Sequence, residues 1–158
     1  MKVIPFLPAL LALALTATAA PAQEDPVDDA VTRWLAAPEQ PLDGVDIVIE
    51  DFMWIARPVV VFADSPNDPA FAEQMDLLAE RADELAQRDV VVIYDTTAQE
   101  PSELRRQLRP RGFMLTLIGK DGQVKLRKPR PWDVREISRS IDKMPMRQRE
   151  VEERRGEG

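Results

Sequence analysis

The residues that could do chemistry lie in two short segments of the 158-residue chain. One is the polar loop Asp64-Ser65-Pro66-Asn67-Asp68, and the other is a run of nine basic residues between positions 105 and 130. The chain has no Cys and no His. Thiol nucleophiles, disulfides, thiolate-bound metals and Ser-His-Asp triads each need one of these side chains, so the sequence excludes them.

The polar loop follows a predicted strand and opens onto a predicted helix. Asp68 suits the N-cap of that helix and Pro69 its first position. Ligands of open α/β sheets favour such strand ends, and a helix N-terminus favours an anion or a partner's carboxylate. Asp64, Ser65, Asn67 and Asp68 are therefore candidate partner-binding residues. The alternative is that Asp68 only caps the helix and Asp64 only solvates the turn.

No catalytic residue, metal ligand or cofactor-binding residue is predicted. Ser65 lacks the Lys base at Ser-x-x-Lys spacing that a nucleophile without His would need. The acids around Asn67 hint at calcium, but the Gly and distant Glu of an EF-hand loop are missing. No pair of carboxylates has a spacing that indicates acid–base catalysis.

The charge of the chain is strongly segregated. Residues 23–104 hold 20 acidic and 4 basic residues, whereas residues 105–130 hold 9 basic and 1 acidic. The basic run either neutralises the acidic helices of the same chain or binds an acidic protein or other anionic partner. Nucleic acid is not expected, because the chain has a net charge of −7 and its basic run is poor in aromatic residues. The candidate partner-binding residues of this run are Arg109, Arg111, Lys120, Lys125 and Arg127.

The elements that must position these residues follow from hydrophobic patterning. Apolar, β-branched runs predict buried strands, and apolar residues at helical spacing predict helices. The Asp121-Gly122 turn predicts a hairpin. Apolar and basic residues alternate along its second strand, so we expect Lys125 and Arg127 to lie together on a solvent-exposed face. The predicted strands span 59–63, 90–94, 113–118 and 124–127, and the predicted helices 69–87, 101–108 and 134–144. Two weaker elements are a helix within 27–35 and a short strand at 47–49.

The predicted order is β-α-β-α-β-β-α, which is that of the thioredoxin fold. We therefore expect a cysteine-free α/β protein with a thioredoxin-like three-layer sandwich. Four segments are predicted. They are a signal peptide over 1–22, an acidic lead-in with a short helix over 23–53, the thioredoxin-like domain over 54–146, and a charged tail over 147–158 that is either a frayed helix or disordered.

Three segments resemble a known family. They are Arg57-Pro58-Val59-Val60-Val61-Phe62-Ala63, Ile118-Gly119-Lys120-Asp121-Gly122-Gln123-Val124-Lys125-Leu126-Arg127 and Ile141-Asp142-Lys143-Met144-Pro145-Met146-Arg147-Gln148-Arg149-Glu150. They are similar to the domain-of-unknown-function-4174 family, a thioredoxin-like group in bacterial exported proteins and animal sushi-repeat and matrix proteins. The resemblance implies the fold but no activity. Where redox thioredoxins carry Cys-x-x-Cys after the first core strand, this chain has the loop Asp64 to Pro69.

Residues 1–22 resemble a secretory signal peptide. Lys2 precedes an apolar stretch, and small residues follow it. Cleavage after Ala22 is preferred over cleavage after Ala19, and an uncleaved anchor is the alternative. The apolar stretch is shorter than the ~20 residues of a spanning helix and contains two prolines. We expect a periplasmic or secreted protein without a stable membrane span after cleavage.

Together these patterns predict an exported, non-catalytic binding or adaptor module. The competing hypothesis is an enzyme of unrecognised class that uses Asp or Glu, with or without a captured metal ion. A third is a subunit that is stable only beside a partner.

Export makes a direct prediction about the N-terminus. Mass spectrometry and N-terminal sequencing of the protein from the exported fraction should give Gln23 as the first residue. A mature protein that retains Met1 would contradict the prediction.

Overall fold

A five-stranded mixed sheet forms the centre of the protein. The computed structural model describes residues 29–156, and its strands lie in the order β1-β3-β2-β4-β5. β2 is parallel to β3 and antiparallel to β4, and β5 is antiparallel to β4. This order and direction confirm the thioredoxin-like fold. The strands are β1 (Leu42–Asp43), β2 (Arg57–Phe62), β3 (Val90–Asp95), β4 (Met114–Ile118) and β5 (Val124–Lys128).

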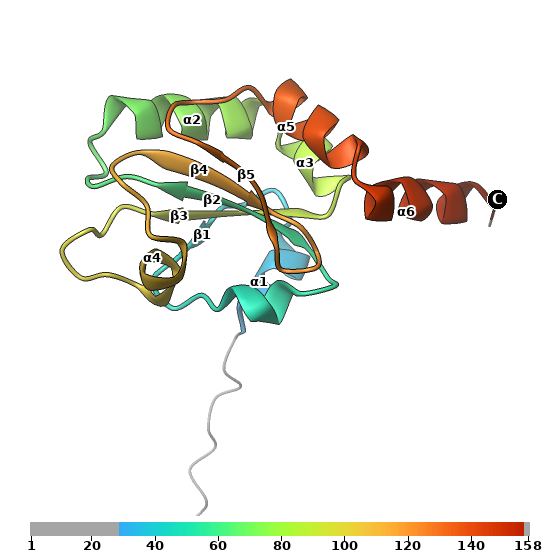
Figure 1. Ribbon diagram of the computed structural model, residues 1–158, viewed down its shortest axis with the longest axis horizontal. Helices are drawn as coiled ribbons and strands as arrows, with labels where there is room; N and C mark the ends of the chain where they lie inside the picture. Colours follow the sequence, from blue (N-terminus) through green and yellow to red (C-terminus); the bar gives the residue numbers. More distant parts are fainter. Residues whose placement is uncertain (1–28, 157–158) are drawn as a thin grey trace, which may run out of the picture.

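Helices cover both faces of the sheet (Figure 1). One face carries α1 (Ala30–Ala36), the 3-10 helix η1 (Ile49–Phe52) and α4 (Glu103–Leu108). The other carries α2 (Pro69–Glu80), α3 (Ala82–Ala86) and α5 (Val134–Asp142). The helix α6 (Pro145–Gly156) extends beyond the end of the sheet (Figure 1). The predicted three-layer sandwich is confirmed.

The alternating side chains of the central strands supply two cores. On β2, Val59 and Val61 pack beneath α2, α3 and α5, while Val60 and Phe62 pack against α1, η1 and α4. All four side chains are fully buried. A strand covered on both faces explains why its sequence is continuously apolar instead of alternating.

Two predicted elements need correction. The single helix expected over 69–87 is broken at Arg81 (φ −135°, ψ 36°), although Leu78 and Leu85 on either side of the break both stay buried. The strand expected at 47–49 is wrong. Ile47 lies in a loop and Ile49 begins η1, and both side chains are buried in the core. Their apolar side chains therefore reflect burial in the core, not a strand.

The edge strand β1 lies instead at Leu42–Asp43, so the sheet extends into the segment predicted to be a lead-in. Gly44 ends this strand and donates its N–H to the Tyr94 carbonyl at 2.8 Å. A Cβ at Gly44 would lie 2.8 Å from Leu104 Cδ1 and 3.0 Å from the Tyr94 carbonyl oxygen, so a larger residue here would displace these neighbours.

The charged tail is helical as far as Gly156, which agrees with the first of its two predicted forms. The proposed signal peptide, residues 23–28 and residues 157–158 lie outside the described residues. No helix within residues 29–156 is long and apolar enough to cross a membrane.

The two-sided core predicts a large cost for truncating its central side chains. Leu117→Ala should lower the free energy of unfolding by about 2–5 kcal/mol, because it leaves a cavity beneath α5. Chemical denaturation measures this cost. The exposed control Val48→Ala should change stability by no more than about 0.5 kcal/mol. Equal effects of both substitutions would contradict the packing described.

Candidate functional site

A buried ion pair lies at the carboxyl end of β3. The Arg105 Nε donates to Asp95 Oδ1 at 2.9 Å, and the Ser102 hydroxyl donates to Asp95 Oδ2 at 2.5 Å. The Thr97 N–H donates to Asp95 Oδ1 at 2.8 Å. The side chain of Asp95 is 0% exposed and that of Arg105 is 7% exposed. Every oxygen of this buried carboxylate is thus hydrogen bonded.

The hydrogen bonds decide the charge state of Asp95. Burial alone would raise its pKa, but the Ser102 hydroxyl, the Thr97 N–H and Arg105 together outweigh burial and lower the pKa below its ordinary value. Asp95 is therefore a carboxylate at neutral pH, and its pair with Arg105 is charged on both sides.

Arg105 also joins neighbouring segments of the chain. Its Nη2 donates to the carbonyls of Ala63 and, at 2.9 Å, of Asp95. Its guanidinium lies 5.4 Å from the centre of the Phe62 ring, and its Nη1 lies 3.7 Å from Asp64 Oδ1. One side chain on α4 therefore connects the ends of β2 and β3, the two strands whose loops form this edge of the molecule.

We call this surface the loop edge and define it by residues 64–68, 96–99 and 109–112. A hollow of about 310 Å³ lies between its first two loops. Asp68 accepts from the Ala70 N–H at 2.8 Å, so it caps α2 as predicted. The Ser65 Oγ accepts from the Asn67 N–H at 3.2 Å, while Asp64 remains 63% exposed. These four predicted residues are brought together on one loop.

Arg109 and Arg111 lie on the third loop of this edge. Arg109 ends α4 in the left-handed conformation (φ 49°), and Gly112 continues the turn with φ 61°. Both arginines are exposed, and neither forms an ion pair with another residue in the described part of the chain. A Cβ at Gly112 would lie 4.0 Å from Asp64 Oδ2, so the loop that carries these two arginines adjoins the polar loop.

Arg127 supports this edge from β5. Its Nη1 donates to the Leu108 carbonyl at 2.5 Å and lies 3.7 Å from the Met114 sulfur. It therefore satisfies one of the free carbonyls at the end of α4, one residue before Arg109.

Lys120 and Lys125 lie at the opposite end of the sheet, because β4 runs antiparallel to β2. The Lys120 Nζ lies 2.9 Å from Asp89 and 3.0 Å from Glu150, and the Lys125 Nζ lies 2.6 Å from Asp121. These pairs agree with the interpretation that the basic run neutralises acids of the same chain.

The expectation that Lys125 and Arg127 share one face is wrong. The register shifts between Leu117 and Ile118, so that Leu117 faces Leu126 while Ile118 faces Val124, leaving Lys125 without a partner of its own. This β-bulge interrupts the alternation. Lys125 borders Met144 between α5 and α6, whereas Arg127 reaches α4.

Sequence reasoning did not single out Asp95, Ser102 and Arg105. An Asp at the end of an apolar strand and an Arg one turn after a Ser N-cap were the available signals. The spacing Ser-x-x-Lys does occur at Ser140 and Lys143, but no hydrogen bond joins them. Within residues 29–156, no group of three or more Asp or Glu side chains is arranged to hold a metal ion.

Comparison with known proteins identifies the family of this chain. The family described as "Domain of unknown function (DUF4174)" matches residues 48–150. The chain belongs to this family, as the resemblance in its sequence predicted. No curated protein matches.

Two solved structures from Plasmodium yoelii are similar to this chain. One is Prx1a, modified at its N-terminus to form an artifactual octamer. It is 17% identical to this chain, and the aligned region covers 61% of this chain and 77% of the Prx1a chain, with a TM-score of 0.47. The other is thioredoxin peroxidase I, which is 16% identical. Its aligned region covers 61% of this chain and 76% of the peroxidase chain, with a TM-score of 0.45.

The lowered pKa of Asp95 predicts how stability depends on pH. At pH 7, Asp95→Asn should lower the free energy of unfolding by about 3–5 kcal/mol, because it leaves the buried Arg105 with only the exposed Asp64 carboxylate, 3.7 Å away, as a counter-charge. A carboxylate with a depressed pKa stabilises the fold above its unfolded pKa of about 3.9 and loses that contribution as the pH falls further.

Denaturation of the parent and Asp95→Asn proteins across this pH range tests the prediction. The difference between them should be constant at neutral pH and shrink below about pH 4. Asp121→Asn is the control in the half-buried hairpin turn and should cost far less, because both Asp121 and its partner Lys125 remain partly in water. A difference that grows on acidification would contradict the charge state assigned to Asp95.

Proposed function

We propose that this chain is an exported binding module that recognises an anionic protein partner at its loop edge and carries out no thiol chemistry. The observation that carries the proposal is the pair of exposed arginines, Arg109 and Arg111, on a loop that adjoins the polar loop at Gly112. Exposed arginines pair with carboxylates through planar, bidentate hydrogen bonds.

The rigidity of the loop edge supports a role in binding. The Thr97 N–H bond to Asp95 holds the backbone of the 96–99 loop, and the Arg127–Leu108 hydrogen bond holds the backbone just before the 109–112 loop. A surface that is ordered before contact loses less conformational entropy when a partner binds. Asp64, Ser65 and Asn67 add polar groups beside the arginines, so the surface offers both donors and acceptors.

The choice of a partner over a substrate rests on what the edge contains. Its hollow is lined by Asp64, Ser65, Pro66 and residues 96–99, without an apolar enclosure and without a buried titratable side chain in the lining. Small-molecule sites are usually apolar clefts with a few convergent polar groups. The proposed export places the module where its partner is a periplasmic or extracellular protein.

Affinity capture tests this function. The mature chain, from Gln23 onward, is immobilised and exposed to the exported fraction at low and high salt. We expect one reproducible protein partner, whose recovery falls at high salt because the contact is electrostatic.

The double variant Arg109→Ala/Arg111→Ala should reduce affinity for that partner about tenfold and flatten its salt dependence. The matched control Arg33→Ala/Arg135→Ala also removes two exposed arginines but leaves the loop edge intact. Equal losses in both variants would refute the site. A chelator-sensitive turnover of a small molecule would favour an enzyme instead.

A further inference from the structure

A second surface lies along β5, away from the loop edge. Two adjoining hollows of about 310 and 510 Å³ share Lys125, Met144 and Pro145. They lie between β5 and residues 143–149, where α5 gives way to α6. We call this surface the β5 groove.

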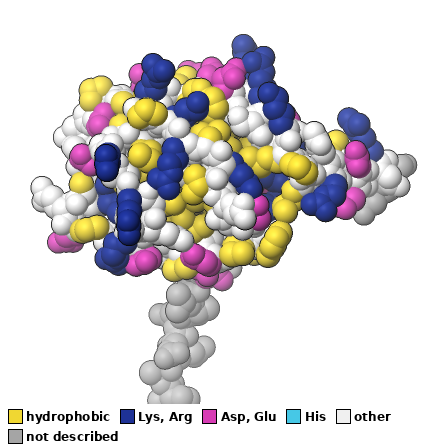
Figure 2. Space-filling view, in the orientation of Figure 1, with side chains coloured by type: hydrophobic (Ala, Val, Ile, Leu, Met, Phe, Trp, Pro, Cys, Tyr) yellow, Lys and Arg dark blue, Asp and Glu magenta, His cyan; other side chains and the backbone are white. Residues whose placement is uncertain are grey.

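The lining of the β5 groove combines apolar and basic side chains. Its apolar part is contributed by Leu126, Trp132, Met144, Pro145 and Met146. Figure 2 shows the face that carries β5, with hydrophobic side chains over its centre and toward α6 and with Lys and Arg side chains around them. Unbranched methionines adapt to differently shaped apolar partners, so this floor suits a docked side chain.

The charge of the groove is one-sided. Asp121 is its only carboxylate among the lining residues, and that side chain is paired with Lys125. Arg57 and Lys120 are held by Asp89 and Glu150. The remaining basic residues of the lining form no ion pair within residues 29–156, and they are Lys128, Lys143 and Arg149. The Lys128 Nζ lies 4.2 Å from the centre of the Trp132 ring.

β5 also offers a backbone for pairing. It is the last strand of the sheet and pairs only with β4 in the described sheet, so its outer edge presents free N–H and C=O groups. An extended peptide can add to such an edge, with alternate side chains entering the adjoining groove. Lysines on an edge strand also deter pairing with uncharged or basic strands, which makes the edge selective for acidic ones.

We infer that the β5 groove binds an extended acidic segment of a partner protein, in which large apolar side chains and carboxylates both occupy every second position and so point to the same face of the strand. The segment adds as a strand to β5. The side chains of that face enter the groove, where the apolar ones lie beside Met144 and Trp132 and the carboxylates meet Lys143 and Arg149. This surface is separate from the loop edge, so the module would contact two partners or two parts of one partner.

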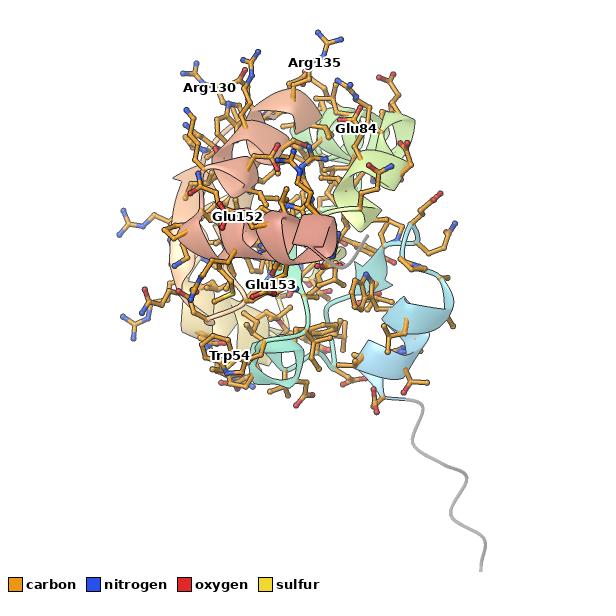
Figure 3. All side chains as sticks on the ribbon, turned by 90° about the vertical axis from the view of Figure 1, so that its right-hand side faces the viewer. Trp54, Glu84, Arg130, Arg135, Glu152 and Glu153 are labelled. Atoms are coloured by element: carbon orange, nitrogen blue, oxygen red, sulfur yellow. The ribbon has the colours of Figure 1, made fainter. Side chains whose placement is uncertain are left out.

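The test uses a fluorescent synthetic peptide in which phenylalanine and glutamate occupy every second position in turn, with threonine at the positions between them. Lys143→Glu/Arg149→Glu reverses two exposed charges of the groove, and Arg33→Glu/Arg135→Glu is the matched control. Arg135 projects into solvent at the top of Figure 3, and Arg33 lies on α1 at the other side of the sheet. Thermal unfolding of each variant verifies that it folds.

The groove variant should weaken peptide binding at least about tenfold, and the control should not. Bound peptide should also slow amide hydrogen exchange of residues 124–128. Three results would overturn the inference: no binding of the peptide to the parent protein, equal losses of binding in the groove and control variants, or unchanged hydrogen exchange in β5 when the peptide is bound. So would binding of anionic lipid vesicles but not of the peptide, or occupation of the groove by a second copy of the chain.

The variants separate this inference from the proposed function. Arg109→Ala/Arg111→Ala should leave peptide binding at the β5 groove unchanged, and Lys143→Glu/Arg149→Glu should leave the contact at the loop edge intact. Failure of one surface therefore does not imply failure of the other.

Discussion

The buried pair of Arg105 and Asp95 is the interaction on which the loop edge depends. Two charges that are almost completely removed from water are stable only when their remaining hydrogen-bonding positions are filled. Here a hydroxyl, a backbone N–H and two carbonyls fill them, and those groups belong to the ends of β2 and β3 and to α4. Moving any of these three segments would leave a buried charge without its hydrogen bonds. The ion pair therefore stabilises one arrangement of the ends of β2 and β3 and of α4.

A second ionic cluster fixes the opposite end of the sheet. Arg57 is 1% exposed and donates to Glu150 on α6 at 2.9 Å, while Lys120 on the hairpin contacts the same carboxylate and Asp89. Burial alone would raise the pKa of Glu150, but Arg57 and Lys120 outweigh burial and lower it. This cluster anchors the otherwise exposed α6 and so forms one wall of the β5 groove. Arg105 and Lys120 of the basic run thus stabilise opposite ends of the sheet through ion pairs. Only the basic residues of this run that form no ion pair are available to a partner.

Sequence patterns predicted the elements that depend on local rules. Continuous β-branched runs identified β2 and β3, Asp68 identified the start of α2, and Asp121-Gly122 identified the hairpin. Asp64, Ser65, Asn67 and Asp68 were predicted as site residues because they follow a strand and precede a helix, whereas Arg109 and Arg111 were predicted from the basic run.

The remaining features depend on contacts between distant residues. Arg105 and Ala63 are 42 positions apart, and no local pattern indicates that they meet. The two-residue strand β1 is too short for a period-2 pattern. The bulge at Lys125 shifts a register that the alternating sequence cannot reveal. The division of the basic residues between two surfaces follows from these tertiary contacts.

Amide hydrogen exchange of the mature chain, measured with and without its captured partner, tests most directly whether the partner binds at the loop edge. Binding there should slow exchange at residues 64–68, 96–99 and 109–112, with little change in α1 and β1. Slowed exchange confined to α1 and β1, with an unchanged loop edge, would show that the partner binds elsewhere.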